Sequence, residues 1–164
     1  MKRIIVIGCP GAGKSTFARK LSAKTGLPLF YLDMIWHLPD RTTLSREEFA
    51  NRLEQIAAQD EWIIDGNYLH TMPFRLKHCD TVFYFDLPTD LCLAGAEERI
   101  GKEREDMPWT EDSLDDEFRQ WIVDFPTQQR PVINSLLSEY KQKVRIVVFH
   151  TREDADAFID SITH

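Results

Sequence analysis

The feature that most constrains this chain is a glycine-rich loop near its beginning, between an apolar run and a helical pattern. Residues 8–15 read Gly-Cys-Pro-Gly-Ala-Gly-Lys-Ser and match the phosphate-binding pattern G-x-x-x-x-G-K-[ST], the P-loop. The β-branched run in residues 3–7 predicts a buried parallel strand, and a helix is expected from Lys14 to about Thr25. A glycine turn with an incidental lysine is the alternative, but the flanking strand and helix favour a site for a nucleoside triphosphate with Mg²⁺.

Each part of this loop has an expected role. The glycines let the backbone N–H groups surround phosphate oxygens, and the helix N-terminus adds the positive end of its dipole. We expect Lys14 to reach the β- and γ-phosphates and to act in catalysis, Ser15 to bind Mg²⁺, and Thr16 to contact the α-phosphate. The predicted cofactor-binding residues of the loop are Gly8, Pro10, Gly11, Ala12, Gly13, Lys14, Ser15 and Thr16.

Strand patterns alternate with helical patterns along the chain. This alternation predicts an α/β protein with the three-layer P-loop NTPase fold, in which a five-stranded parallel sheet carries helices on both faces and a short helical lid. The expected strands are 3–7, 29–32, 61–64, 81–85 and 144–149, and the expected helices are 14–25, 45–57, 89–100, 113–123, 131–140 and a last one around 155–162. In two of these helices the side chains expected to point inward are Leu114, Phe118, Trp121 and Ile122, and Val132, Ile133, Leu136 and Leu137.

Composition and charge narrow the class further. No linker or repeat divides residues 1–164, so we expect one domain, with a core of about 1–98 and 142–164 and a lid with its following helices at about 99–141. The formal charge of −7 argues against nucleic-acid binding, because such a chain lacks a general attraction to phosphate backbones. No apolar run approaches the roughly 20 residues of a membrane span, and no signal peptide is present. We therefore expect a cytoplasmic protein without a membrane partner.

Three aspartates are expected where strands end. Asp33, Asp65 and Asp86 follow the second, third and fourth predicted strands, and the carboxyl ends of parallel strands share the edge that binds ligands. Carboxylates there can hold metal-bound water or accept a proton from an attacking hydroxyl. Ordinary turn chemistry is the alternative. We assign Asp65 to the metal site and Asp33 to catalysis, and favour the structural explanation for Asp86.

Arginines are concentrated after the fourth strand. Arg99 and Arg104 flank Gly101 in a stretch without clear periodicity, which is expected to be a small mobile lid, and Arg119 and Arg130 lie on the helices that follow. Arginines stabilise the charge that develops in phosphoryl transfer. A solvated surface position is the alternative for each one taken alone. A further arginine, Arg75, is a weaker candidate for contact with a phosphoryl acceptor.

These segments together resemble the adenylate-kinase-like P-loop kinases, and most closely the small proteins often labelled topology modulation proteins. The resemblance implies a five-stranded parallel sheet and a lid, with Asp65 organising Mg²⁺ through water. It also implies that Arg99 stacks on adenine, that Arg104 contacts phosphate, and that Arg119 and Arg130 contact the transferring phosphates. The stretches that carry it are the loop at 8–16, Tyr-Leu-Asp at 31–33 with Trp36, Glu-Trp-Ile-Ile-Asp-Gly-Asn-Tyr at 61–68, Arg-Leu at 75–76, Phe-Asp-Leu-Pro at 85–88, and Trp-Ile…Phe-Pro…Arg-Pro at 121–131.

The departures from this pattern concern the acceptor. Asn67-Tyr68 stands where adenylate kinases carry an aromatic residue, a proline and an arginine that grip AMP, the lid is shorter, and the shikimate kinase glycine triplet is absent. We therefore predict an ATP- and Mg²⁺-dependent kinase whose small-molecule acceptor is neither AMP nor shikimate. The alternative is a nucleotide-binding regulatory protein with little turnover, associated with DNA or a protein partner. A GTPase is disfavoured because no N/T-K-x-D motif occurs, and the oligomeric state stays open.

Overall fold

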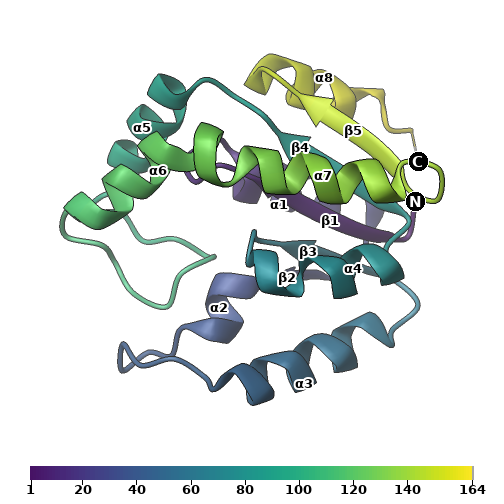
Figure 1. Cartoon of the computed structure of the whole chain (residues 1–164), viewed down its shortest axis with the longest axis horizontal. Coiled ribbons are helices and arrows are strands. Elements are labelled where there is room, and N and C mark those ends of the chain that lie inside the picture. The colour runs from purple at the N-terminus through teal and green to yellow at the C-terminus, as the bar shows by residue number, and fades with distance from the viewer. Residues whose placement is uncertain (164) are drawn as a thin grey trace.

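The computed structural model describes residues 1–163, and its centre is a five-stranded parallel sheet (Figure 1). The strand order is β2-β3-β1-β4-β5, and each neighbouring pair is parallel. The sheet predicted from the alternation of strand and helix patterns is confirmed. The strands are β1 (Arg3–Gly8), β2 (Leu29–Tyr31), β3 (Trp62–Asp65), β4 (Thr81–Phe85) and β5 (Arg145–Phe149).

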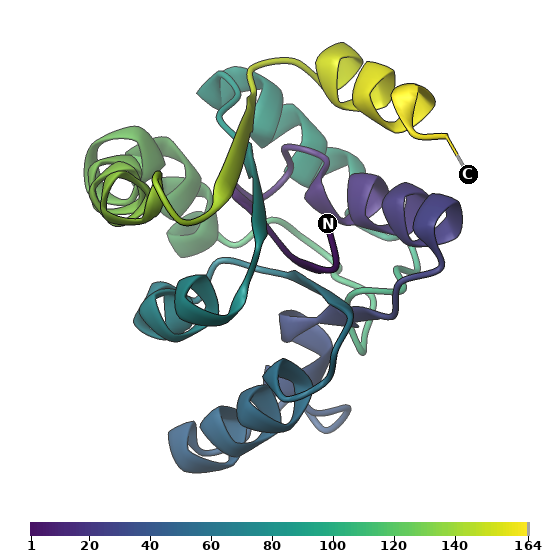
Figure 2. The ribbon, with the colours of Figure 1, turned by 90° about the vertical axis from the view of Figure 1, so that its right-hand side faces the viewer.

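Helices cover both faces of this sheet and give the fold three layers. Figure 2 shows α1 (Lys14–Thr25) and α8 (Arg152–Ser161) on one side, and α4 (Met72–His78) and α7 (Arg130–Tyr140) on the other. The central strand β1 lies between these layers, so the loop that follows it opens at the middle of the sheet edge. The remaining helical elements are α2 (Leu32–Trp36), α3 (Arg46–Ala57), η1 (Leu69–Thr71), α5 (Thr89–Glu98) and α6 (Asp116–Gln128).

The core explains why β1 is an unbroken apolar run. Ile4, Ile5, Val6 and Ile7 are all fully buried, because a parallel strand in the middle of a covered sheet has no solvent-facing side. Phe17 of α1 adds an aromatic contact, with its ring centroid 4.9 Å from that of Phe83. Burial of a side chain of this size contributes about 1.5–3 kcal/mol. The strand before the glycine-rich loop, β1, and the helix after it, α1, are therefore both anchored in the core.

Local signals place α3 correctly. The hydroxyl of Ser45 accepts a hydrogen bond from the backbone N–H of Glu48 at 3.1 Å and so caps the start of the helix. The apolar residues at helical spacing, Phe49, Leu53 and Ile56 among them, are buried. By contrast, α2 and α4 were not predicted, because five and seven residues are too few for a helical period to stand out.

The second half of the chain differs most from expectation. The helix predicted at 113–123 begins instead at Asp116, where Asp115 caps it, and continues through Pro126 to Gln128. One proline removes a single backbone donor, and buried neighbours such as Phe125 compensate for that loss. Trp121 and Val132 were predicted to be buried but are 36% and 46% exposed. The lid segment, residues 99–115, consists of turns, and the helices expected after it are α6 and α7.

The length and hydropathy of a helix decide whether it can span a bilayer. Within residues 1–163, no helix combines the length and the apolar character that a bilayer span requires.

Candidate functional site

The glycine-rich loop forms a cradle between β1 and α1. Its Gly11 and Gly13 adopt positive φ angles of 81° and 107°, and Gly13 directly precedes the first residue of α1. Positive φ is accessible to glycine without steric cost, and the first N–H groups of α1 have no partner within the helix. The loop therefore presents free backbone donors and the positive end of a helix dipole to an anion, as the motif predicted.

Three contacts that the sequence did not reveal hold this cradle in shape. The Asn67 side chain bonds both backbone groups of Gly8, accepting from its N–H at 2.9 Å and donating to its carbonyl at 2.6 Å. The Arg152 guanidinium donates to the carbonyl of Gly11 at 2.9 Å. Gly95 of α5 lies so close to the loop that a Cβ there would come within 3.0 Å of the Gly11 carbonyl carbon. No local sequence signal marks Arg152 or Gly95, because both act across more than 80 residues of chain.

Lys14 lies inside the cradle, with its Nζ 3.2 Å from the Cys9 carbonyl that accepts its hydrogen bond. Burial lowers the pKa of the Lys14 ammonium, and the nearby Asp65 carboxylate opposes that shift. A buried ammonium with little compensating charge favours an anionic ligand. Lys14 therefore lies within the loop that the motif predicts to bind phosphate, and its contact with phosphate stays a prediction.

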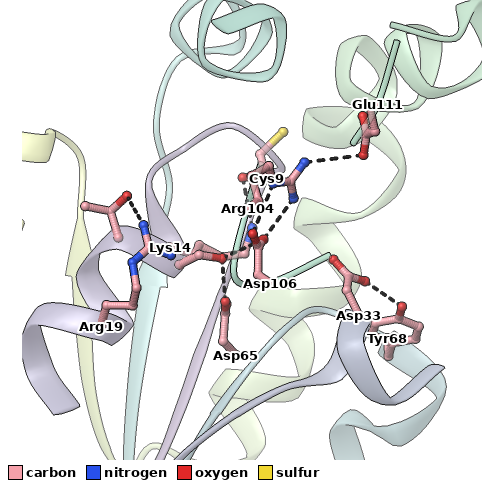
Figure 3. Close-up of polar contacts among 11 residues, drawn as sticks. Cys9, Lys14, Arg19, Asp33, Asp65, Tyr68, Arg104, Asp106 and Glu111 are labelled. Carbon is pink, nitrogen blue, oxygen red and sulfur yellow. Dashed lines mark hydrogen bonds and ion pairs between the residues drawn. The ribbon is translucent and has the colours of Figure 1, made fainter. Parts of the chain in front are cut away.

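Ser15 connects the loop to two buried carboxylates (Figure 3). Its Oγ lies 2.7 Å from Oδ2 of Asp65, at the end of β3, and 3.0 Å from Oδ2 of Asp106, in the lid. Burial raises the pKa of Asp65 to about 6, and Asp106 contributes to that rise. The other oxygen of Asp65, Oδ1, has no hydrogen-bond partner among the described residues. Sequence reasoning predicted Ser15 and Asp65 but missed Asp106.

This group of oxygens fits a magnesium ion. Mg²⁺ prefers oxygen ligands, usually one or two carboxylates together with water and phosphate. A serine hydroxyl beside two buried carboxylates, one with an unpartnered oxygen, offers such a set. No group of three or more His, Cys, Asp or Glu side chains within residues 1–163 forms a closed metal site, so the ion's other ligands would be water and phosphate.

Ion pairs within the lid surround Asp106, the lid residue that contacts Ser15. Arg104 donates from Nε to Oδ1 of Asp106 at 3.0 Å and from Nη2 to Oδ2 at 2.8 Å, and Nη1 lies 3.3 Å from Glu111. Arg99 lies beside them, and burial lowers the pKa of its guanidinium, with Arg104 adding to that effect. Its Nε has no hydrogen-bond partner in the described part of the chain. The two lid arginines expected at a phosphate site are thus both brought to the loop.

Two cavities meet at this place. One, of about 560 Å³, lies over the loop and α1 and includes Thr16, whose hydroxyl accepts from Arg19 at 3.3 Å. The other, of about 980 Å³, extends between α2, the segment after β3 and the lid, and includes Pro10 and Asp65. Such an arrangement suits two ligands that react where the cavities join. The residues common to both linings are Lys14, Ser15, Arg99, Arg104 and Asp106.

The larger cavity contains the second predicted aspartate. Asp33 lies in the first turn of α2 rather than at the end of β2, and its Oδ1 accepts a hydrogen bond from the Tyr68 hydroxyl at 2.6 Å (Figure 3). Burial raises the pKa of Tyr68, and the Asp33 charge adds to that rise. Trp36 and His37 line the same cavity. Asp33 and Asp65 therefore share one cavity, as the strand-end argument predicted.

Several predicted residues lie elsewhere in this structure. Arg119 pairs with Glu97 at 2.8 Å and Arg130 with Asp86 at 2.9 Å. None of these four lines either cavity, so contact of Arg119 and Arg130 with phosphate stays a prediction. Among the loop residues, Gly8 and Ala12 are buried and also line neither cavity.

Arg75 does not face a ligand. It is 1% exposed, and its guanidinium donates to the carbonyls of Gly66 and Asn67 and to the Thr71 hydroxyl. Because all three nitrogens bond to these groups, Arg75 fixes the segment after β3. The suggestion that it contacts an acceptor is wrong, and a single sequence gives no signal that this arginine is buried.

Comparison with known proteins agrees with this fold. No protein-family model matches the sequence. An adenylate kinase of Thermotoga neapolitana is 28% identical over 88 residues, which make up 52% of this chain and 39% of that enzyme. The matched region thus spans well under half of the relative's length.

Solved structures match over nearly the whole chain. A shikimate kinase from Bacteroides thetaiotaomicron superposes with a TM-score of 0.60 at 17% identity, covering 97% of this chain and 94% of that one. A shikimate kinase from Acinetobacter baumannii, solved with shikimate, gives a TM-score of 0.63 at 16% identity, covering 98% and 92%. The chain therefore shares the overall fold of these two solved structures.

Proposed function

We propose that this chain is an ATP-dependent small-molecule kinase, which transfers the terminal phosphoryl group of ATP to a nucleotide, nucleoside or similar small acceptor. The observation that supports this most directly is the meeting of two cavities at Lys14, Ser15 and the lid arginines. Phosphoryl transfer requires donor and acceptor oxygens roughly in line across one phosphorus atom. A donor in the smaller cavity and an acceptor in the larger one satisfy that requirement.

The donor side follows from the loop and the lid. Bound between Ser15 and Asp65, Mg²⁺ would neutralise charge on the phosphates. Lys14 and the guanidinium groups of Arg99 and Arg104 would bind the phosphate oxygens, on which charge accumulates during transfer. Burial raises the pKa of Asp65 to about 6 and so disfavours its ionised form. A cation beside Ser15 would reverse that preference.

The acceptor side centres on Asp33. Its carboxylate accepts from the Tyr68 hydroxyl at 2.6 Å, which leaves the second carboxylate oxygen for a substrate hydroxyl. An aspartate in this place would orient the attacking hydroxyl and accept its proton. Tyr68 would hold that carboxylate in position rather than react itself.

Two further parts of the proposal depend on the sequence alone. The cytoplasmic location expected from the sequence stays a prediction. The likeness of the chain to the proteins labelled topology modulation proteins stays a prediction as well. The acidic balance of the chain favours a small-molecule acceptor over DNA.

ADP release tests the proposal. Wild-type protein with Mg²⁺ and ATP is compared with Lys14→Ala across a panel of nucleosides, nucleotides and hydroxyl metabolites. We expect at least one acceptor to raise ADP release, and Lys14→Ala to lower the stimulated rate about 100-fold or more. The matched control is Lys24→Ala, since Lys24 lies in the last turn of the same helix and outside both cavities.

The alternative of a regulatory nucleotide-binding protein makes a different prediction. ATP present at 100 times its Kd would stabilise the fold by about 2.7 kcal/mol, yet no acceptor would raise ADP release above basal hydrolysis. That pair of results would overturn the kinase proposal.

A further inference from the structure

The outer part of the larger cavity is acidic. Beyond the residues that the two cavities share, and beyond the Asp65 of the metal group, its acidic and basic lining consists of five carboxylates, one guanidinium and the imidazole of His37. Two of the carboxylates have partners, since Glu111 pairs with Arg104 and Asp115 caps the backbone N–H of Glu117. The five carboxylates are Asp33, Glu111, Asp112, Asp115 and Glu117, and the guanidinium is Arg41.

Within residues 1–163, the lysine and arginines that line this cavity are Lys14, Arg41, Arg99 and Arg104, and of these Arg41 alone lies outside the region shared with the smaller cavity. Arg41 lies over the Trp109 ring, with its guanidinium carbon 5.1 Å from the ring centroid. Arg104 is committed to Asp106 and Glu111. Arg75, the nearest arginine behind the wall, is buried and bonded to backbone carbonyls. A carboxylate or phosphate on the part of the acceptor outside the shared region would therefore face five carboxylates and one guanidinium, that of Arg41.

Aromatic side chains form much of the remaining wall. Trp36 and Tyr68 meet edge to face, with ring centroids 6.2 Å apart, on the side nearest Asp33. Trp109 of the lid also lines this cavity, and its ring centroid lies 5.3 Å from that of His37. Trp109 already carries a cation on one face. Aromatic faces beside carboxylates attract flat apolar groups and cations, and repel anions.

We infer that the phosphoryl acceptor is a hydroxyl compound with a flat or apolar face that is uncharged or cationic, and that carries neither carboxylate nor phosphate. This inference rests on the proposed kinase function, narrows its acceptors by excluding nucleotides, and is supported by the acidic, aromatic lining of the cavity. The unpartnered Oδ1 of Asp65, a residue only 5% exposed, lies at its inner end. The phosphoryl group in transfer would therefore lie beside Lys14, while the rest of the acceptor would lie against carboxylates and aromatic rings.

Binding of three matched probes tests the inference. Tyramine, tyrosol and 4-hydroxyphenylacetate share one hydroxyphenyl group and differ in charge, being cationic, neutral and anionic. Each is titrated into the full-length protein with Mg²⁺ and a saturating non-hydrolysable ATP analogue, and quenching of tryptophan fluorescence reports binding at Trp36 and Trp109. We expect tyramine and tyrosol to bind about tenfold or more tightly than 4-hydroxyphenylacetate, which corresponds to one or two unpaired carboxylates acting near the surface.

A variant separates charge from shape. Asp112→Asn combined with Glu117→Gln removes two exposed carboxylates that line the cavity. This double change should reduce the ratio between the Kd values of 4-hydroxyphenylacetate and tyramine several-fold. The control is Glu54→Gln, because Glu54 is exposed on α3 and lies outside the cavity. Equal or absent binding of the three probes, or tighter binding of the anion, overturns the inference.

Parallel ADP-release assays keep the two proposals apart. A preference for the cationic and neutral probes with no ADP release from any acceptor would remove the kinase function but leave the charge preference standing. Stimulated ADP release with anionic acceptors alone would leave the kinase function standing and remove this inference.

Discussion

Replacement of Gly95 by alanine tests how the P-loop is shaped by the helix behind it. In the middle of an ordinary exposed helix, this change stabilises a protein by about 1 kcal/mol. In α5, a Cβ on residue 95 would lie 2.9 Å from Nη2 of Arg152 and 3.0 Å from the carbonyl carbon of Gly11, with the carbonyl oxygen closer still. We therefore expect the opposite sign.

The magnitude follows from the distances. Ordinary van der Waals contact begins at about 3.4 Å, so α5 and the loop must separate by at least several tenths of an ångström. Overpacking by one methyl group costs about 1–3 kcal/mol. After the gain of about 1 kcal/mol in helix propensity is subtracted, the net loss expected for Gly95→Ala is up to about 2 kcal/mol. Because the displaced carbonyl belongs to Gly11, we also expect ATP affinity to fall about tenfold.

Urea unfolding of the nucleotide-free protein measures the first quantity, and titration calorimetry with ATP and Mg²⁺ measures the second. Ala94→Gly is the matched control, because Ala94 is the exposed neighbour on the same helix. That change should cost about 1 kcal/mol of stability and leave ATP affinity unchanged. If Gly95→Ala is as stable as the wild type and binds ATP equally well, the argument that α5 holds the loop in shape is refuted.

Three further changes test separate contacts of the site. Asp65→Asn should stabilise the metal-free protein by up to about 3 kcal/mol at pH 7.5, because the native pKa of Asp65 is raised from 3.8 to about 6. The folded state then favours the proton, so wild-type stability falls as pH rises from about 4 to 6 and the advantage of the variant disappears near pH 4. Urea unfolding in EDTA at both pH values checks this, and a pH-independent difference contradicts it. Asn67→Ala should cost about 1–3 kcal/mol in the same assay, since it leaves both backbone groups of Gly8 without the side chain that bonds them. Tyr68→Phe removes the hydroxyl that donates to Asp33 and should lower kcat or raise the acceptor KM while the KM for ATP stays the same. A changed KM for ATP would show that Tyr68 acts on the donor side instead.

The donor half of the site could be predicted because its signals are local. The P-loop, its flanking strand and helix, and the buried run Ile4–Ile7 lie within about 25 consecutive residues, where period and spacing are informative. Asp65 followed from the rule that parallel strands share one ligand-binding edge. Asp86 shows the limit of that rule, because its carboxylate pairs with Arg130 and lies outside both cavities.

The missed residues act across long stretches of chain. Asp106 meets Ser15 across 91 positions and Arg152 meets Gly11 across 141, so each contact depends on how the lid and α8 pack. Arg75 resembles a surface arginine in the sequence and becomes structural only because the segment after β3 folds over it. The ends of short helices and the exposure of Trp121 likewise depend on tertiary packing rather than on local pattern.

The most direct test of the central claim follows the terminal phosphoryl group itself. Wild-type protein and Lys14→Ala are incubated with γ-labelled ATP, Mg²⁺ and a set of uncharged, cationic and anionic hydroxyl compounds, and the label is located by chromatography. We predict that the wild type moves the label to a small acceptor and that Lys14→Ala does not. Label that is released only as inorganic phosphate, with every acceptor and at the same rate as without one, would contradict the account.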